Sequence, residues 1–522
     1  MDTSTRSADH GADAATAAHR FGLGEASLDT VTPDPRAWLL AQIGPADAPA
    51  DDLAGTAEAL ALIETVNRER RAQRAAPPPP TAITAAATSA TAPPSRVAMT
   101  AAAEPAATDD ARGERKPNDL ERALRESVRD HLRAHLQTAA TSRRPFSERL
   151  VLFWSNHFTV SMAKGSVRGL VGPFERDAIR PHIAGSFETL LKAAVTHPAM
   201  LRYLDNQQSA GPDSRVVQRL AQRARGTSTN GADGINGING TNGGNNRPPR
   251  ITGLNENLAR EVLELHTLGV AEQDYTQADV TAFAAVLTGW RGATDAATMA
   301  RGATASAFDP NWHQPGSKTV LGRSIPEGPH GLDAVLHTLA LHPATARHIA
   351  TKLARHFVAD DPPPTLVARL AARFQSSGGD LAAVYCALID SSEAWDPQPR
   401  KLKTPEELII SSARLLQVGD SAFKRIPDGG AAQLGQRLQL APSPAGWPDR
   451  AEEWLGPDAV WKRVEWATRV ADRAARGVDA RALALQSLGP RLQETTARQI
   501  ERAADGPQAL ALLLLAPEFQ RR

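Results

Sequence analysis

Apolar side chains recur every three and four residues along most of this 522-residue sequence. Ala, Leu, Arg, Gln and Glu dominate the same stretches, and runs of β-branched residues are scarce. This spacing puts the apolar side chains on one face of an α-helix, and the dominant residues are strong helix formers. The sequence therefore predicts an all-α fold, a multi-helix globular bundle with at most a small β-hairpin.

Strand signals are few, and the best one lies near residue 310. Residues 304–308 and 318–321 flank a turn that contains Pro315 and Gly316. This pattern is typical of a two-stranded hairpin. We expect that hairpin to be an addition to a helical body.

Two His-Pro pairs predict where helices begin. His197-Pro198 and His342-Pro343 each follow an apolar helical run. Proline suits the first position of a helix because its missing N–H would have no partner there. We expect both histidines to cap the helices that follow them.

Three segments have too few apolar residues to form a core. Residues 1–14 are small and polar, residues 76–112 form a Pro/Ala/Thr tract, and residues 226–250 repeat Asn-Gly steps. None of them can bury enough apolar surface to offset the entropy lost on ordering. We predict a disordered tail at 1–14, a Pro/Ala-rich linker at 76–112 and a disordered insertion at 226–250.

These low-complexity segments divide the chain into two helical parts. An N-terminal helical segment at residues 15–75 is expected to pack on a helical core domain at residues 117–522. The insertion at 226–250 interrupts that core domain.

Charge and hydropathy disfavour several classes of partner. The chain has 59 Lys and Arg against 58 Asp and Glu and lacks a long basic block, which argues against nucleic acid. It also lacks an uninterrupted apolar stretch of about 18 residues and an apolar run after a basic start near residue 1. Its single cysteine, Cys386, lies in an apolar run, where it is expected to be a small buried hydrophobe. We predict a cytoplasmic protein without a membrane span.

The densest polar motif surrounds residue 260. On a helix, Asn257, Arg260, Glu261 and Glu264 form a polar stripe along the edge of an apolar face. Two carboxylates one turn apart beside an arginine can hold a hard cation, transfer protons or form an internal ion-pair network. His266 points away from this stripe, so we favour a packing or capping role for it over metal ligation.

A second motif places an imidazole among large aromatic side chains. Leu150, Trp154, His157 and Phe158 share one helical face. Burial on that face would lower the pKa of His157 and keep it neutral. A neutral buried histidine can be a base, a metal ligand or a hydrogen-bonded core residue, and we favour the last.

The remaining candidate binding residues are scattered along the chain. They are Asn257, Trp154, Asp205, Asn206 and Trp290. An Asp-Asn pair is also an ordinary way to end a helix. The sequence contains none of the established signatures of nucleotide binding, serine hydrolases or zinc proteases.

Taken together, the motifs resemble the bacterial family catalogued as domain of unknown function 1800. The resemblance covers residues from about 19 and then from 117 to the end of the chain. It rests on stretches that include Trp154-Ser155-Asn156-His157-Phe158, His197-Pro198-Ala199, Leu254-Asn255-Glu256-Asn257, Tyr275-Thr276-Gln277, Leu287-Thr288-Gly289-Trp290, Lys403-Thr404-Pro405 and Gly446-Trp447-Pro448.

The resemblance supports a helical fold and supplies no accepted catalytic residues. Proteins of this family are similar in often being encoded beside a second family, domain of unknown function 1501, whose members look like alkaline phosphatases and sulfatases. Some relatives carry an aspartate directly after the hairpin histidine, whereas Gln314 follows His313 here.

Three hypotheses about function follow. The first is a non-catalytic helical scaffold that binds a partner, with a protein of unknown function 1501 as the candidate partner. The second is a metal-assisted, hydrolase-like enzyme in which Glu261, Glu264 and His157 bind a divalent metal or transfer protons and Arg260 stabilises charge. The third is a binder of polyanions through Arg-rich helices. The second requires His157 and the carboxylate stripe to converge on one cleft.

Overall fold

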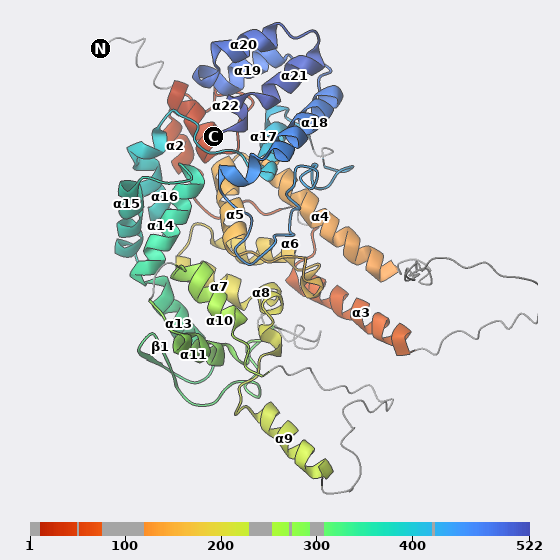
Figure 1. Ribbon diagram of the computed structural model, residues 1–522, viewed down its shortest axis with the longest axis vertical. Helices are drawn as coiled ribbons and strands as arrows, with labels where there is room; N and C mark the ends of the chain where they lie inside the picture. Colours follow the sequence, from red (N-terminus) through yellow and green to blue (C-terminus); the bar gives the residue numbers. More distant parts are fainter. Residues whose placement is uncertain are drawn as a thin grey trace, which may run out of the picture.

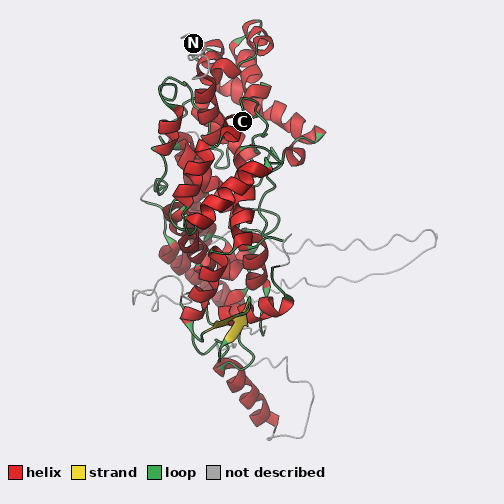
Figure 2. Cartoon of the chain, turned by 90° about the vertical axis from the view of Figure 1, so that its left-hand side faces the viewer, coloured by secondary structure: helices red, strands yellow, loops and turns green. Residues whose placement is uncertain are grey.

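The computed structural model describes residues 11–49, 52–75, 119–228, 253–270, 274–292, 307–419 and 423–522. Over these ranges the regular elements are helices and one two-stranded antiparallel sheet (Figure 1). Figure 2 shows the helices packed into an elongated body with the sheet near one end. The predicted all-α fold is confirmed.

The N-terminal part is helical from residue 11. After a helix at residues 11–16 come the π-helical turn η1 (Ala17–Phe21), α2 (Pro35–Leu40) and α3 (Thr56–Ala75). The predicted disordered tail was therefore too long, because Ala14 is buried among apolar side chains. Residues 1–10 and the predicted linker at 76–112 lie outside the described residues.

The central part alternates long helices with short turns. The helices are α4 (Asp119–Thr141), α5 (Pro145–His157), α6 (Val171–Phe174), α7 (Phe187–Thr196), α8 (Pro198–Tyr203), α9 (Arg215–Ser228), α10 (Asn257–Glu261) and α11 (Gln277–Leu287). The π-helical turns are η3 (Glu175–Ile179) and η7 (Val262–Thr267), and the 3-10 turns are η2 (Gly165–Val167), η4 (Arg180–His182) and η5 (Asn206–Gln208). Helix α9 continues into the first residues of the predicted insertion at 226–250, and the rest of that insertion is not among the described residues.

The C-terminal part is helical after the sheet. Its helices are α13 (Pro329–Ala340), α14 (Pro343–Phe357), α15 (Pro364–Ser376), α16 (Leu381–Asp390), α17 (Pro405–Leu415), α18 (Pro457–Ala474), α19 (Ala480–Leu488), α20 (Glu494–Glu501), α21 (Gly506–Leu515) and α22 (Pro517–Gln520). Its 3-10 turns are η8 (Ser392–Trp395), η9 (Ala451–Trp454) and η10 (Gly489–Arg491). None of the described helices is both long enough and apolar enough to cross a membrane.

The predicted hairpin forms with a different partner strand. Strand β1 (Lys318–Val320) pairs with β2 (Arg323–Ile325), not with residues 304–308. Leu321 and Gly322 between them have φ of 50° and 70°, the left-handed conformation of a tight two-residue turn. Phe308 makes only an isolated bridge to Trp290, and residues 304–306 lie outside the described ranges.

Both predicted histidine caps are confirmed. The Nδ1 atom of His197 accepts a hydrogen bond from the backbone N–H of Ala199 at 3.1 Å. His342 accepts in the same way from Ala344 at 3.2 Å. Each ring therefore satisfies a backbone N–H that the helix itself cannot satisfy.

Two hydrophobic cores fill the body. The larger joins the N-terminal segment to helices from α5 through α16, and the smaller lies mainly among α17 to α22. Figure 1 shows α18 to α22 gathered at one end of the body and α11 with β1 at the other. In the larger core, the ring of Phe21 lies 5.2 to 6.1 Å from those of Phe146, Phe357 and Trp395. The N-terminal segment is thus part of the core.

Replacing Phe21 tests that conclusion. Phe21→Ala removes a fully buried ring and should lower the free energy of unfolding by roughly 3–5 kcal/mol. Urea denaturation measures the change, with Leu485→Ala as control, because Leu485 is 63% exposed and should matter by less than about 0.5 kcal/mol. Equal stabilities of the two variants would show that the N-terminal segment is dispensable for the core.

Candidate functional site

The predicted carboxylate stripe forms an ion-pair network at the surface. Arg260 bonds Glu256 Oε2 at 3.3 Å and Glu264 Oε1 at 3.4 Å, one turn away in each direction. It also donates to Gln277 Oε1 on α11 at 2.9 Å. These contacts connect α10 to α11, so the network has a structural role.

Two other stripe residues take no part in that network. Asn257 is exposed, and its backbone N–H bonds the side chain of Asn255 at 2.9 Å. Glu261 is half-buried, and burial together with the neighbouring Glu264 raises its pKa. Within the described part of the chain, neither residue belongs to a group of acidic, histidine or cysteine side chains that could hold a metal ion.

His157 lies in the core. Its Nε2 atom is 3.2 Å from the carbonyl oxygen of His266, and its ring packs against Phe153, Trp154 and Phe158. Burial holds the pKa of His157 well below its ordinary value. The contacts of this ring are with aromatic rings and a backbone carbonyl, and none is with the carboxylate stripe.

The helix that carries the stripe changes type directly after Glu261. Residues 262–267 adopt the π-helical turn η7, so the positions beyond Glu261 do not follow the α-helical period. His266 is fully buried and lies 6.0 Å from the ring of His157. Gly269, with φ of 90°, follows that turn. The favoured packing position of His266 agrees with its burial.

The candidate binding residues near residue 205 join two helix ends. The side-chain amide of Asn206 donates to the carbonyl oxygens of Leu287 and Trp290 at 3.0 and 2.7 Å. Asp205 has a left-handed φ of 60° and forms an ion pair with Lys164 at 2.5 Å. These contacts fix the ends of α8 and α11 relative to each other.

Trp154 is also a structural residue. Its indole N–H donates to the hydroxyl of Tyr385 at 2.7 Å, and that hydroxyl donates to the carbonyl of Ile183 at 2.6 Å. Both aromatic side chains are fully buried. The chain of hydrogen bonds connects α5 and α16 through the core.

A cavity with several charged side chains in its walls lies beside α5. Its volume is about 260 Å³, and its walls come from α5, α14, the beginning of α17 and residues 445–450. Its polar lining consists of Asn156, His157, Lys352, Arg355, His356, Thr404, Glu406, Glu407, Gln436, Asp449 and Arg450. Of the residues predicted from sequence, only His157 is among them.

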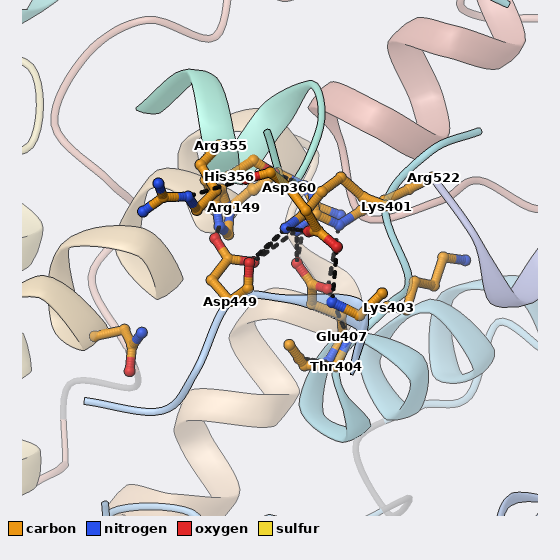
Figure 3. Close-up of polar contacts among 12 residues, drawn as sticks. Arg149, Arg355, His356, Asp360, Lys401, Lys403, Thr404, Glu407, Asp449 and Arg522 are labelled. Atoms are coloured by element: carbon orange, nitrogen blue, oxygen red, sulfur yellow. Dashed lines mark hydrogen bonds and ion pairs between the residues drawn. The ribbon is translucent and has the colours of Figure 1, made fainter. Parts of the chain in front are cut away.

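Glu407 is the centre of the charged group behind this cavity (Figure 3). Its Oε1 atom lies 2.5 Å from Arg149 and 3.0 Å from Arg522, and Oε2 accepts from the N–H of Thr404 at 2.9 Å. The last contact is half of a capping box that begins α17. Burial opposes ionisation of Glu407, but Arg522 and Arg149 outweigh it and lower the pKa to about 2.

Asp449 is the second carboxylate of the group. It accepts from His356 Nδ1 at 2.9 Å and from Lys401 Nζ at 3.0 Å. Lys401 also bonds Asp360 at 2.5 Å, as Figure 3 shows. Burial opposes ionisation of Asp449, but His356, Lys401 and Arg522 hold its pKa below the ordinary range. Both carboxylates are therefore charged and already bound by cations.

Lys352 and Arg355 differ from the other cations of the group. They stand one turn apart on α14, and both line the cavity. Among the described residues neither has an ion pair, and the single hydrogen bond of the Arg355 side chain goes to the carbonyl of Asp360 at 3.1 Å. Burial lowers the pKa of Lys352 to about 8; Asp449 opposes this shift and Arg355 adds to it.

Asn156 holds one wall of the cavity in place. Its side chain donates to the carbonyl of Trp447 at 2.9 Å and accepts from the N–H of the same residue at 2.7 Å. Gly446 before it has φ of 86°, and a Cβ there would lie 2.5 Å from the Asn156 carbonyl. Only glycine fits this close approach. The sequence Gly446-Trp447-Pro448 could therefore have been used to predict a tightly packed segment here, which forms one wall of the cavity.

The spacing of Lys352, Arg355 and His356 was another signal that the sequence offered. These residues share one helical face, as do the stripe residues, and could have been proposed on the same ground. The contact of Arg149 with Glu407 could not have been predicted in this way, because the two residues are 258 positions apart in the sequence.

One family model matches residues 16–521, that of a protein of unknown function (DUF1800). No curated protein and no solved structure gives a match. The earlier resemblance is thus confirmed over nearly the whole chain.

Glu407→Gln tests whether the charged group is the structural centre of this region. The change leaves Arg149 and Arg522 buried without their carboxylate and should lower the free energy of unfolding by roughly 3–5 kcal/mol. Urea denaturation measures the change. The matched control is Glu393→Gln, which breaks a half-exposed pair with Arg369 and should cost below about 1 kcal/mol. A loss in Glu407→Gln no greater than in the control would contradict the central role.

Proposed function

Since this chain belongs to the family of proteins of unknown function DUF1800, we propose a function from its own side chains. The protein binds a small molecule that carries an anionic group, a carboxylate, phosphate or sulfate, in the cavity between α5 and α14. Lys352 and Arg355 are the residues that bind this group.

The unmatched charge of Lys352 and Arg355 is the observation that carries the proposal. Arg149, Arg522 and Lys401 already neutralise Glu407, Asp449 and Asp360. The two cations on α14 have no such partner in the described ranges, although they are partly buried and line the cavity. Partly buried charges are costly unless they are paired, and an anionic ligand would supply the pair.

The cavity favours such a ligand in two further ways. Its walls partly exclude water, so a charge pair formed inside is screened less than one on the open surface. The guanidinium of Arg355 can also donate two parallel hydrogen bonds, the geometry that carboxylates and phosphates prefer. Asn156, Thr404 and Gln436 add uncharged polar groups to the wall, which suits a ligand with hydroxyl or amide groups.

The other hypotheses stay predictions with their own tests. A scaffold role beside a protein of unknown function 1501 in the cytoplasm calls for copurification of the two proteins. The enzyme hypothesis for Glu261, Glu264 and His157 calls for metal analysis of the purified protein. The bonds of Arg260 to Glu256 and Glu264, and the core position of His157, do not favour it.

Lys352→Met tests the proposed binding site. The change keeps the length of the side chain and removes its charge, so affinity for sulfate or acetate should fall by roughly tenfold or more. Isothermal titration calorimetry measures it. Lys192→Met is the control, because Lys192 forms a half-exposed ion pair with Asp333 elsewhere and should leave binding unchanged. Unchanged affinity in Lys352→Met would remove the basis of the proposal.

The pH dependence of sulfate binding gives a second test. Lys352 has a pKa of about 8 and attracts an anion only when protonated, with Asp449 and Arg355 as the charged groups that influence it. Affinity should therefore be constant below about pH 7 and fall as pH rises through 8, by as much as about tenfold per unit. Sulfate does not titrate there, so the change reports on the protein. A flat profile in the parent protein, equal to that of Lys352→Met, would argue against Lys352.

A further inference from the structure

A second set of cationic side chains lies deeper, where the N-terminal segment meets the C-terminal helices. Lys403 is 0% exposed, and its Nζ atom has no hydrogen-bond or ion-pair partner among the described residues. Its close contact is with the face of the Phe519 ring, 4.0 Å from Nζ to the centroid. Such a contact compensates only part of the cost of removing an ammonium group from water.

Arg491 lies close to Lys403 and is also incompletely bonded. Its Nε atom and one of its terminal nitrogens are buried without a partner. After burial, the Arg491 guanidinium is the largest influence that lowers the pKa of Lys403. Lys403 and Arg491 also both lower the pKa of His19, which is otherwise lowered mainly by burial. The contacts of α22 agree with this: Lys403 lies over the ring of Phe519, and Gln493, two residues after Arg491, donates to Glu518.

Uncharged hydrogen-bonding groups complete this region. His19 Nδ1, Ser411 Oγ and Ser487 Oγ are all buried without a partner. His19 Nε2 bonds the carbonyl of Ser487 at 2.7 Å, which brings α19 to η1. A Cβ placed on Gly24 would lie 3.7 Å from both His19 Nδ1 and Ser411 Oγ, so both atoms lie beside the backbone of Gly24.

The nearby carboxylates are Glu407 and Glu518, and one Glu518 oxygen, Oε2, is buried without a hydrogen-bond partner. Glu407 is bound by Arg149 and Arg522. Glu518 accepts through Oε1 from the N–H of Gln493 at 3.0 Å and from the hydroxyl of Thr496 at 2.9 Å. Neither forms an ion pair with Lys403 or Arg491 in the part of the chain that the structure describes. Buried donors without a partner, on Lys403, Arg491, Ser411 and Ser487, outnumber this one unpartnered carboxylate oxygen within the described part of the chain.

We propose that Lys403 and Arg491 bind a small inorganic anion of the size of chloride, with the hydroxyls of Ser411 and Ser487 as additional donors. The anion pairs with the charge of Arg491 and favours the protonated form of Lys403, which burial otherwise disfavours. It thereby joins η1, the beginning of α17 and η10 at the boundary of the two cores. This site is separate from the cavity of Lys352 and does not depend on the proposed function.

Bromide locates the site directly. Crystals of the full chain soaked in sodium bromide should give an anomalous peak in contact with Lys403 Nζ and Arg491. A peak only at exposed lysines, or only beside Lys352 and Arg355, would overturn the proposal, because bromide would then be an adventitious ion or a ligand of the other cavity.

Thermal unfolding tests the energetic role. The measurements compare sodium chloride with sodium gluconate at equal ionic strength, in the Lys352→Met background, in which anion binding in the cavity is weakened. The unfolding midpoint should rise with the logarithm of the chloride concentration, as it does for any ligand of the folded state. Equal midpoints in the two salts would overturn the proposal.

Lys403→Met in the same background should abolish the chloride dependence. Lys462→Met, which removes an exposed ion pair with Asp458, should retain it and serves as the control. If Lys403→Met does not fold, the comparison of the two salts in the background protein still decides the question. A chloride dependence that survives in folded Lys403→Met would overturn the assignment to Lys403.

Discussion

The buried ion group of Arg149, Glu407 and Arg522 is the contact on which the rest of the structure depends. One carboxylate binds two guanidinium groups and also caps α17, so it fixes α5, α17 and residue 522 at one point. Charges buried this deeply are tolerated only when their geometry is fully satisfied. The group joins α5, whose apolar side chains lie mainly in the larger core, to α17, whose apolar side chains lie in the smaller core, and Glu407 also lines the cavity.

Local chemistry predicted much of the fold. The three-and-four spacing gave the helices, and the His-Pro pairs marked two helix starts, because both signals act within one turn of chain. The hairpin was placed correctly at Lys318 but given the wrong partner strand, since the two-residue turn at Leu321 and Gly322 was overlooked.

The candidate site was harder to predict from the sequence than the fold. The stripe was expected on a regular helix, and the π-helical turn after Glu261 has no clear mark in the sequence. Lys352 and Arg355 can be recognised in the sequence as a pair one helical turn apart. Only the tertiary structure shows that neither forms an ion pair with a carboxylate among the described residues.

Some buried charges in this part of the protein are paired and others are not. Around Glu407 and Asp449 each carboxylate is bound by more than one cation, and the result is rigid. Lys352 is partly buried and Lys403 fully buried, and neither forms an ion pair with a carboxylate among the described residues. Unpaired charge of this kind lowers stability, and proteins retain it mainly where it binds something. The contrast separates the charges that hold the fold from those proposed to hold ligands.

The sequence distance of the Arg149–Glu407 contact also has a consequence for folding kinetics. The two partners are 258 positions apart in the sequence and must be brought together before this ion pair can form, whereas helices and helical hairpins form from near neighbours. Contacts of such long range belong to the late stages of folding, so the pair should contribute little to the rate of folding. Its stabilisation would then act chiefly on the rate of unfolding. The ion group would therefore make the folded protein long-lived without making it fold faster.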